Sequence, residues 1–185
     1  MRLYNYLMEK FQNNYCVSSS RLPKYDYSRA GYYFVTICTQ NKKCHFGRVV
    51  GHEVQLSEIG KIVKEEILKT PQIRPNVSLD QWIIMPNHIH AIIVIHNVET
   101  HCNASLQYHN VFGPQKNNLA SIVRGFKSAA TKRINSAFGQ NYFSWQPRFY
   151  DHVIRNEKSL QNIRQYIASN VGKWLMDEMY APNLK

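Results

Sequence analysis

The stretch MPNHIHAIIVI, residues 85–95, constrains the fold more than any other part of the chain. Pro86 and Asn87 form turns readily, and HIHAIIVI is an apolar run with the length of one strand. Because side chains alternate along a strand, His88 and His90 share one face of it. Histidine is uncommon in an apolar stretch, since its ring nitrogens need partners once they are buried. We therefore expect one common role to explain why both histidines lie on this face of an apolar strand.

The patterns around this strand predict an α+β fold with one antiparallel sheet and helices packed on it. VSLDQWIIM before the turn predicts a strand that pairs with the apolar run as a hairpin. Nearer the N-terminus, YYFVTICT predicts a strand, and CHFGRVVGHEVQLS predicts a second strand or hairpin with bends at Gly47 and Gly51. Apolar residues at helical spacing predict three helices. The first runs from Ser57 to the prolines of TPQIRPN, the second from about Leu119 to Ala137, and the third over roughly Glu157 to Asn170.

The chain of 185 residues fits one domain whose core needs neither disulfides nor a structural metal. Residues 1–30 predict an N-terminal basic and aromatic arm, 31–175 the catalytic domain, and 176–185 a tail. Residues 97–117 have weak periodicity and many turn formers, which predicts a mobile insert. No apolar segment approaches the roughly 20 residues that span a membrane, and the start of the chain lacks the apolar core of a signal peptide. We therefore expect a cytoplasmic protein without a membrane partner.

The charge of the chain indicates a polyanionic partner. Lys and Arg total 23 against 12 Asp and Glu, a formal net charge of +11. Nucleic acid is the leading candidate, because single strands stack on aromatic side chains that stand among basic ones. The candidate DNA contacts lie in the arm and on one helix face: Arg21, Lys24, Tyr25, Tyr27, Arg29, Arg124, Lys127, Lys132 and Arg133.

A His-x-His pair on a strand can chelate one ion when a third ligand arrives from another element. On the third expected helix, Tyr166 and Asn170 lie one turn apart beside the buried stripe. An amide oxygen is a suitable ligand for Mg²⁺ or Mn²⁺, and a phenol beside such an ion can attack a phosphorus atom. In the alternative interpretation the histidines are partnered at the edge of the core, Tyr166 is a packing aromatic, and Asn170 caps the helix before Gly172.

Several separate segments carry a family resemblance. They are SRLPKYDYSRAGYYFVTICTQNKKCHFG (20–47), MPNHIHAIIVI (85–95), SWQPRFYDHVIRN (144–156) and LQNIRQYIASN (160–170). In order, spacing and composition they resemble the REP-associated tyrosine transposases of the HUH superfamily, which are similar to the single-tyrosine transposases of bacterial insertion sequences. The resemblance covers roughly residues 18–175 and implies a ferredoxin-like (RRM-like) core, the HUH nuclease core.

By this resemblance, His88, His90 and Asn170 are the ligands of Mg²⁺ or Mn²⁺, and Tyr166 is the nucleophile. The implied activity is cleavage and strand transfer of single-stranded, hairpin-forming DNA such as REP-like palindromes, through a 5′-phosphotyrosine. Lys173 lies seven residues after Tyr166 and, if the helix persists, on the same side, where it can hold phosphate. The chain differs from the family at Val171, where the family often has proline, so the helix can end differently here.

Other functions remain open at this point. A non-catalytic module that binds single-stranded nucleic acid on a similar sheet explains the charge and the aromatic residues equally well. A zinc hydrolase would need further His or carboxylate ligands near the pair. The sequence does not decide between a monomer and a homodimer.

Overall fold

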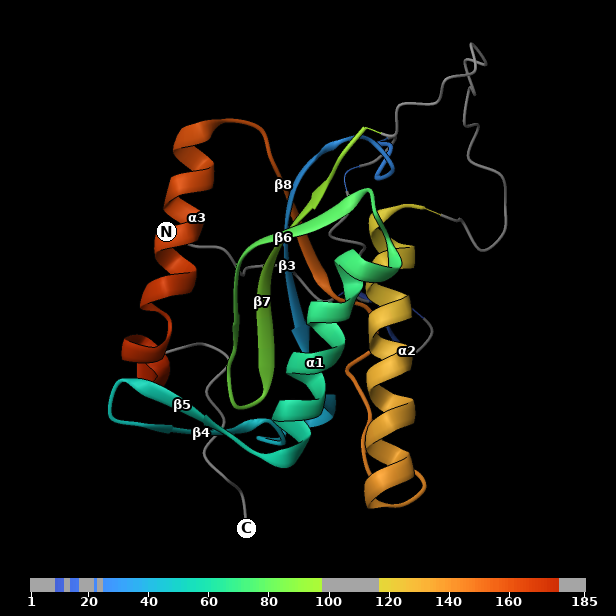
Figure 1. Cartoon of the computed structure of the whole chain (residues 1–185), viewed down its shortest axis with the longest axis vertical. Helices are drawn as coiled ribbons and strands as arrows, with labels where there is room; N and C mark the ends of the chain where they lie inside the picture. Colours follow the sequence, from blue (N-terminus) through green and yellow to red (C-terminus); the bar gives the residue numbers. More distant parts are fainter. Residues whose placement is uncertain (1–8, 12–13, 17–21, 23–24, 98–116, 177–185) are drawn as a thin grey trace.

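The computed structural model describes residues 9–11, 14–16, 22, 25–97 and 117–176 (Figure 1). Nearly all of the predicted mobile insert and tail lie outside this set, as do two candidate DNA contacts of the arm, Arg21 and Lys24.

A four-stranded antiparallel sheet organises the fold. Its strands lie in the order β6 (Val77–Ile84), β7 (His88–Ile95), β3 (Gly31–Cys38) and β8 (Tyr150–Ile154). Along the chain the elements follow as β3, α1, β6, β7, α2 and β8, which is the βαββαβ order of the ferredoxin-like fold. The predicted α+β fold is therefore confirmed, including the hairpin of β6 and β7.

Helices cover both faces of this sheet (Figure 1). α1 (Glu58–Ile73) and α2 (Leu119–Phe138) lie on one face, and α3 (Glu157–Ser169) lies on the other, followed by the short helix η2 (Val171–Met176). Capping side chains set where the helices begin: Ser57, Asn118 and Asn156 each accept a hydrogen bond from a backbone N–H of the first turn.

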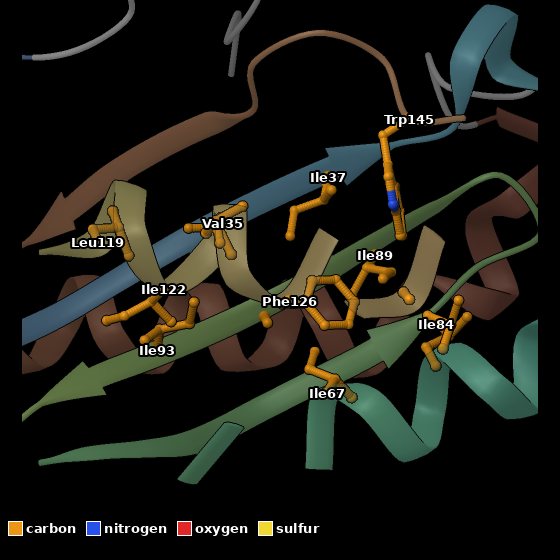
Figure 2. Packing of buried hydrophobic residues seen from close by; sticks show 14 of the residues in the cluster. Val35, Ile37, Ile67, Ile84, Ile89, Ile93, Leu119, Ile122, Phe126 and Trp145 are labelled. Carbon is orange, nitrogen blue, oxygen red and sulfur yellow. The ribbon is translucent and has the colours of Figure 1, made fainter. Parts of the chain in front are cut away.

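Apart from its two histidines, β7 is apolar along its whole length because helices cover both faces of the sheet. Ile89 and Ile93 point toward α1 and α2, where they pack with Ile122 and Phe126 of α2 (Figure 2). Ile92 points to the other face, into a smaller cluster beneath α3. All of β7 is buried, because neighbouring strands and helices surround it.

Smaller elements complete the described chain. β1 (Glu9–Phe11) pairs with β2 (Asn14–Cys16), and η1 (Gln40–Lys42) follows β3. β4 (Gly47–Val50) and β5 (Glu53–Leu56) form a hairpin with its own two-stranded sheet, so the hairpin prediction for this segment is confirmed. Its turn needs Gly51, whose φ of +61° is the left-handed conformation that glycine adopts at little cost.

One expectation about elements was wrong. The segment Tyr150–Ile154 is an edge strand, whereas the sequence predicted no strand between the second and third helices. The first helix does end within TPQIRPN, as predicted: Pro71 lies in the last turn of α1, which continues to Ile73 and is capped by Arg74.

Candidate functional site

The two histidines lie on the face of β7 that α3 and η2 cover. In the sheet register, His88 stands opposite Cys38 of β3 and His90 stands opposite Thr36. Both imidazoles are buried, with exposed fractions of 0% and 2%. This burial is the reason each ring nitrogen needs a partner.

Polar partners fix both imidazole rings. The Nε2 atoms of His88 and His90 lie 3.1 Å apart. On the far side of each ring, Nδ1 of His88 lies 2.8 Å from Oδ1 of Asn87, and Nδ1 of His90 lies 2.9 Å from the hydroxyl of Thr36. Each ring is therefore oriented by its Nδ1 atom and turns its Nε2 atom toward the other histidine.

Tyr166 of α3 lies directly over this pair. Its hydroxyl is 3.3 Å from Nε2 of His90, and the two ring centroids are 5.2 Å apart. The edge of the Tyr166 ring also packs against Phe34 of β3, at a centroid distance of 6.1 Å. The side chain nevertheless remains 41% exposed. The hydroxyl is therefore held beside the histidines on a residue that is partly exposed to solvent.

Asn170 lies one turn after Tyr166, at the C-terminal cap of α3. One turn further on, Trp174 of η2 packs against His88 with a ring-centroid distance of 5.9 Å. Along the chain, Asn170 thus lies between Tyr166, which contacts His90, and Trp174, which contacts His88. It is 2% exposed, and its Oδ1 atom has no hydrogen-bond partner among the described residues. A buried amide oxygen without a partner is costly, unless a ligand satisfies it.

Burial also sets the charge state of His88. Desolvation, together with the positive charge of Lys42, lowers the pKa of His88 to about 3. The ring is therefore neutral at physiological pH, which is the form of imidazole that binds a metal ion.

These residues fit a divalent cation. Two ligand atoms that are each ~2.1 Å from one ion, at right angles to one another, lie roughly 3.0 Å apart. The two Nε2 atoms are separated by 3.1 Å, and the unpartnered Oδ1 of Asn170, at the end of the helix that carries Tyr166, is a hard oxygen atom. Within the described part of the chain, no group of three or more His, Cys, Asp or Glu side chains could hold a metal ion. An ion at this site would therefore have few protein ligands and would complete its coordination with water or phosphate oxygens.

A second apolar cluster and one ion pair attach α3 to the sheet. Leu160 and Ile167 of α3 pack on Phe34, Ile92 and Ile154 of the sheet. Arg164 of α3 forms a bidentate ion pair with Asp80 of β6. These contacts position Tyr166 above His90.

The candidate DNA contacts on α2 divide into two kinds. Lys127 donates to the carbonyl oxygens of Gln146 and Arg148, at 2.8 and 3.1 Å, and burial lowers its pKa. Arg133 pairs with carboxylates of α1. Both side chains thus have partners within the fold, while the Arg133 side chain remains 39% exposed, and their contact with DNA stays a prediction. Arg124 and Lys132 are exposed, as predicted.

The remaining candidate contacts lie in the arm and after α3. Tyr25 and Tyr27 are half-buried and pack against the main core, so they contribute to the fold, and their contact with DNA stays a prediction. Arg29 is exposed. The condition set for Lys173 is not met, because the α-helix ends at Ser169 and continues as η2, from which Lys173 is exposed.

Three residues of the site were not singled out as site residues from the sequence. Thr36 was seen only as part of a strand, and its place opposite His90 depends on the β3–β7 register. Asn87 was interpreted only as a turn former, although its position next to His88 was a usable signal. Trp174 lies in η2, four residues after Asn170, and in this segment the sequence indicated only its neighbour Lys173 as a site residue.

Comparisons with known proteins show relatives of the chain in sequence and in fold. No protein-family model matches the chain. An uncharacterized protein of Haemophilus influenzae is 40% identical over 168 residues, which cover 88% of this chain and 92% of that protein. The REP-associated tyrosine transposase of Escherichia coli is 24% identical over 144 residues, covering 78% of this chain and 68% of that protein.

The solved structure of a REP-associated tyrosine transposase bound to a REP hairpin is similar in fold. It aligns with a TM-score of 0.56 and 22% identity, covering 83% of this chain and 73% of that chain. Within the described ranges, no helix is both long and apolar enough to cross a bilayer. The chain belongs to the same family as the Haemophilus influenzae protein, and its fold is that of the REP-associated tyrosine transposases.

Proposed function

We propose that the chain is a metal-dependent endonuclease and strand transferase that acts on single-stranded, hairpin-forming DNA. The observation that carries this proposal is the position of Tyr166, a 41% exposed residue whose hydroxyl lies 3.3 Å from Nε2 of His90. A packing tyrosine needs neither this exposure nor a place beside paired imidazoles. The likeness to the Escherichia coli transposase supports the same reading.

In the proposed reaction, Tyr166 is the nucleophile. Its oxygen forms a bond to the scissile phosphorus and releases its proton to solvent, while the bond from phosphorus to the 3′ oxygen breaks. The departing 3′ oxygen takes up a proton from solvent and leaves as a free 3′-OH. The product is a 5′-phosphotyrosine. Attack by another 3′-OH reverses the step and rejoins strands without an energy cofactor.

His88, His90 and Asn170 are the proposed ligands of Mg²⁺ or Mn²⁺. When bound, the ion would polarise the oxygens of the scissile phosphate. The protein contributes orientation: Phe34 fixes the plane of the Tyr166 ring, and the Arg164–Asp80 pair fixes its helix on the sheet. Tyr166 needs no large rearrangement to meet a phosphate held beside the histidines.

The proposed DNA contacts are the exposed basic residues Arg29, Arg124, Lys132 and Lys173. Phosphate contacts would give an affinity that falls with salt. The similar solved structure holds a REP hairpin, which supports a hairpin with a single-stranded flank as the substrate here.

Cleavage of a labelled oligonucleotide tests the proposal. Wild-type protein, a hairpin with a single-stranded flank and Mn²⁺ should give a shortened labelled product on a denaturing gel, and EDTA should prevent it. His90→Ala should remove cleavage but keep hairpin binding, whereas His96→Ala, a change at an exposed histidine, should keep both. Binding without cleavage in the wild type would instead support a non-catalytic module.

A further inference from the structure

We propose that Asn87 fixes His88 in one tautomer, the one with a lone pair on Nε2, and that Thr36 allows His90 to change tautomer. The inference rests on the proposed function only in taking the two histidines as ligands of one ion. It makes Asn87 and Thr36 positioning residues with different tasks.

The orientation of the Asn87 amide follows from its two neighbours. Its Nδ2 atom donates to the carbonyl oxygen of Lys42 at 3.1 Å, and a carbonyl oxygen can only accept. The amide oxygen is therefore the atom that faces His88, at 2.8 Å from Nδ1. The backbone oxygen of Asn87 is held as well, since Thr39 donates to it from its N–H and its hydroxyl. Asn87 is 1% exposed, and turning its amide over would place the amide oxygen against the carbonyl oxygen of Lys42.

The tautomer of His88 follows from this amide. An amide oxygen only accepts hydrogen bonds, so Nδ1 of His88 must carry the proton. A neutral imidazole has one proton, and Nε2 of His88 therefore presents a lone pair. That lone pair points toward Nε2 of His90, 3.1 Å away. His88 already has the form that a metal ligand needs.

His90 is in the opposite state. Because Nε2 of His88 can only accept, the hydrogen bond between the two rings requires a proton on Nε2 of His90, and the Tyr166 hydroxyl, 3.3 Å from the same atom, can then only accept from it. The Nδ1 atom of His90 then has a lone pair and accepts from the Thr36 hydroxyl at 2.9 Å. To act as a ligand, His90 must break its Nε2–H bond and form an Nδ1–H bond. One proton leaves the ring and one joins it, so the ring stays neutral.

Thr36 is suited to this exchange, whereas a fixed acceptor or donor would not be. A hydroxyl can donate to Nδ1 of His90 in one tautomer and, after rotating, accept from Nδ1–H in the other. The amide of Asn87 cannot reverse its role in this way, because its NH₂ group is held by Lys42. His88 is thus held in one tautomer, whereas His90 can change from one tautomer to the other.

Nitrogen NMR of the protein stripped of metal with EDTA tests both parts. With ¹⁵N-labelled histidine and assignment by His88→Gln and His90→Gln, we expect His88 as the Nδ1–H form and His90 as the Nε2–H form. On titration with Zn²⁺, a diamagnetic probe, His90 should change to the Nδ1–H form and His88 should keep its form.

Paired variants separate the roles. Asn87→Leu should lose the single tautomer of His88 and weaken Zn²⁺ binding by about 10- to 100-fold. Asn87→Asp keeps the acceptor and should retain the tautomer, with an affinity within a few-fold of wild type or tighter. Thr36→Ser should behave like wild type, while Thr36→Val should weaken Zn²⁺ binding and leave His88 unchanged. Melting curves identify any variant that fails to fold. In that case the Thr36→Ser and Asn87→Asp variants still test the tautomers assigned to His90 and His88.

An Nε2–H form of His88 in the wild type would overturn the proposal, as would an Asn87→Leu variant with unaltered tautomer and affinity. These readouts involve no DNA. If the tautomers are as expected and DNA is not cleaved, the proposed function fails and this inference stands. If DNA is cleaved and the tautomers differ, only this inference fails.

Discussion

Two hydrogen bonds join Arg164 of α3 to Asp80 of β6, from Nε to Oδ1 at 2.8 Å and from Nη2 to Oδ2 at 2.5 Å. Arg164 precedes Tyr166 by two residues, and Asp80 lies on the strand next to the one that carries the histidines. The hydrogen bonds from Arg164 hold the pKa of Asp80 below its usual range. The pair thus ties the helix of the proposed nucleophile to the sheet of the proposed ligands.

We expect Asp80→Asn to slow DNA cleavage more than it weakens DNA binding. The substitution removes the charge that fixes Arg164, so Tyr166 should spend less time over His90, and the melting temperature should fall by a few degrees. Single-turnover rates and binding titrations on one hairpin measure the two effects. Glu157→Gln is the control, because Glu157 is exposed and lies 3.8 Å from the same guanidinium. Equal losses in rate and affinity would argue against positioning.

The environment of Glu66 indicates that the free energy of unfolding depends on pH. Its side chain is 6% exposed and accepts hydrogen bonds from Lys69 and Arg133. Burial alone would raise the pKa of Glu66, but the hydrogen bonds and charges of Lys69 and Arg133 outweigh it and lower the pKa. The folded protein therefore holds the proton less tightly than the unfolded chain does. The carboxylate stabilises the fold above the ordinary glutamate pKa, and this stabilisation is lost as pH falls through the lowered value.

We expect Glu66→Gln to reduce the free energy of unfolding by about 1 to 2 kcal/mol at neutral pH. The difference from wild type should shrink in acid, where the wild-type carboxyl is protonated too. Urea unfolding between about pH 3 and pH 7 measures it. Glu58→Gln, at an exposed residue paired with Lys61, should change little at any pH. A Glu66→Gln difference that stays constant into acid would show that the ion pairs are not its source.

Lys132 and Lys127 should respond differently when DNA binding is measured against salt. Lys132→Ala should reduce the slope of log affinity against log salt by about 1, as the loss of one phosphate contact does. Lys127→Met should leave the slope unchanged and lower stability, because its amine is held by two carbonyl oxygens. The reverse outcome would mean that Lys127, and not Lys132, contacts phosphate.

Most of the fold could be predicted because its elements have strong periodic patterns. β7 and the apolar stripes of the helices are examples, since each buries the residues that its period selects. β8 was missed because YDHVI is short and mixes polar with apolar residues, and its pairing with β3 comes from parts of the chain far apart in sequence. The end of α1 was predictable because the two prolines of TPQIRPN disfavour a continued helix, and α1 ends at Ile73 between them.

The candidate site was predictable where its residues lie on one element. The spacing in β7 placed His88 and His90 on one face, and the helix period placed Tyr166 one turn from Asn170. Partners from other elements were not predictable. Thr36 depends on sheet register, and the internal partners of Lys127 and Arg133 depend on how α2 packs on α1 and on the segment before β8.

Tyr166→Phe should lower DNA cleavage by about a thousandfold or more and leave folding and hairpin binding nearly unchanged. The substitution removes the hydroxyl and keeps the ring, so the contacts with Phe34 and His90 survive. Tyr142→Phe is the control, because Tyr142 is 52% exposed and lies outside the site. Wild-type cleavage rates in the Tyr166→Phe variant would exclude this nucleophile.

Mass spectrometry of the covalent protein–DNA adduct tests the central claim most directly. Trypsin releases residues 165–173, in which Tyr166 is the one tyrosine, and separately residues 149–155, which contain Tyr150. After incubation of the wild type with hairpin DNA and Mn²⁺, followed by nuclease and trypsin digestion, we expect a 5′-phosphonucleotide on the 165–173 peptide. EDTA and Tyr166→Phe should each abolish it. An adduct on the 149–155 peptide, or DNA cleavage with no adduct at all, would contradict the proposed mechanism.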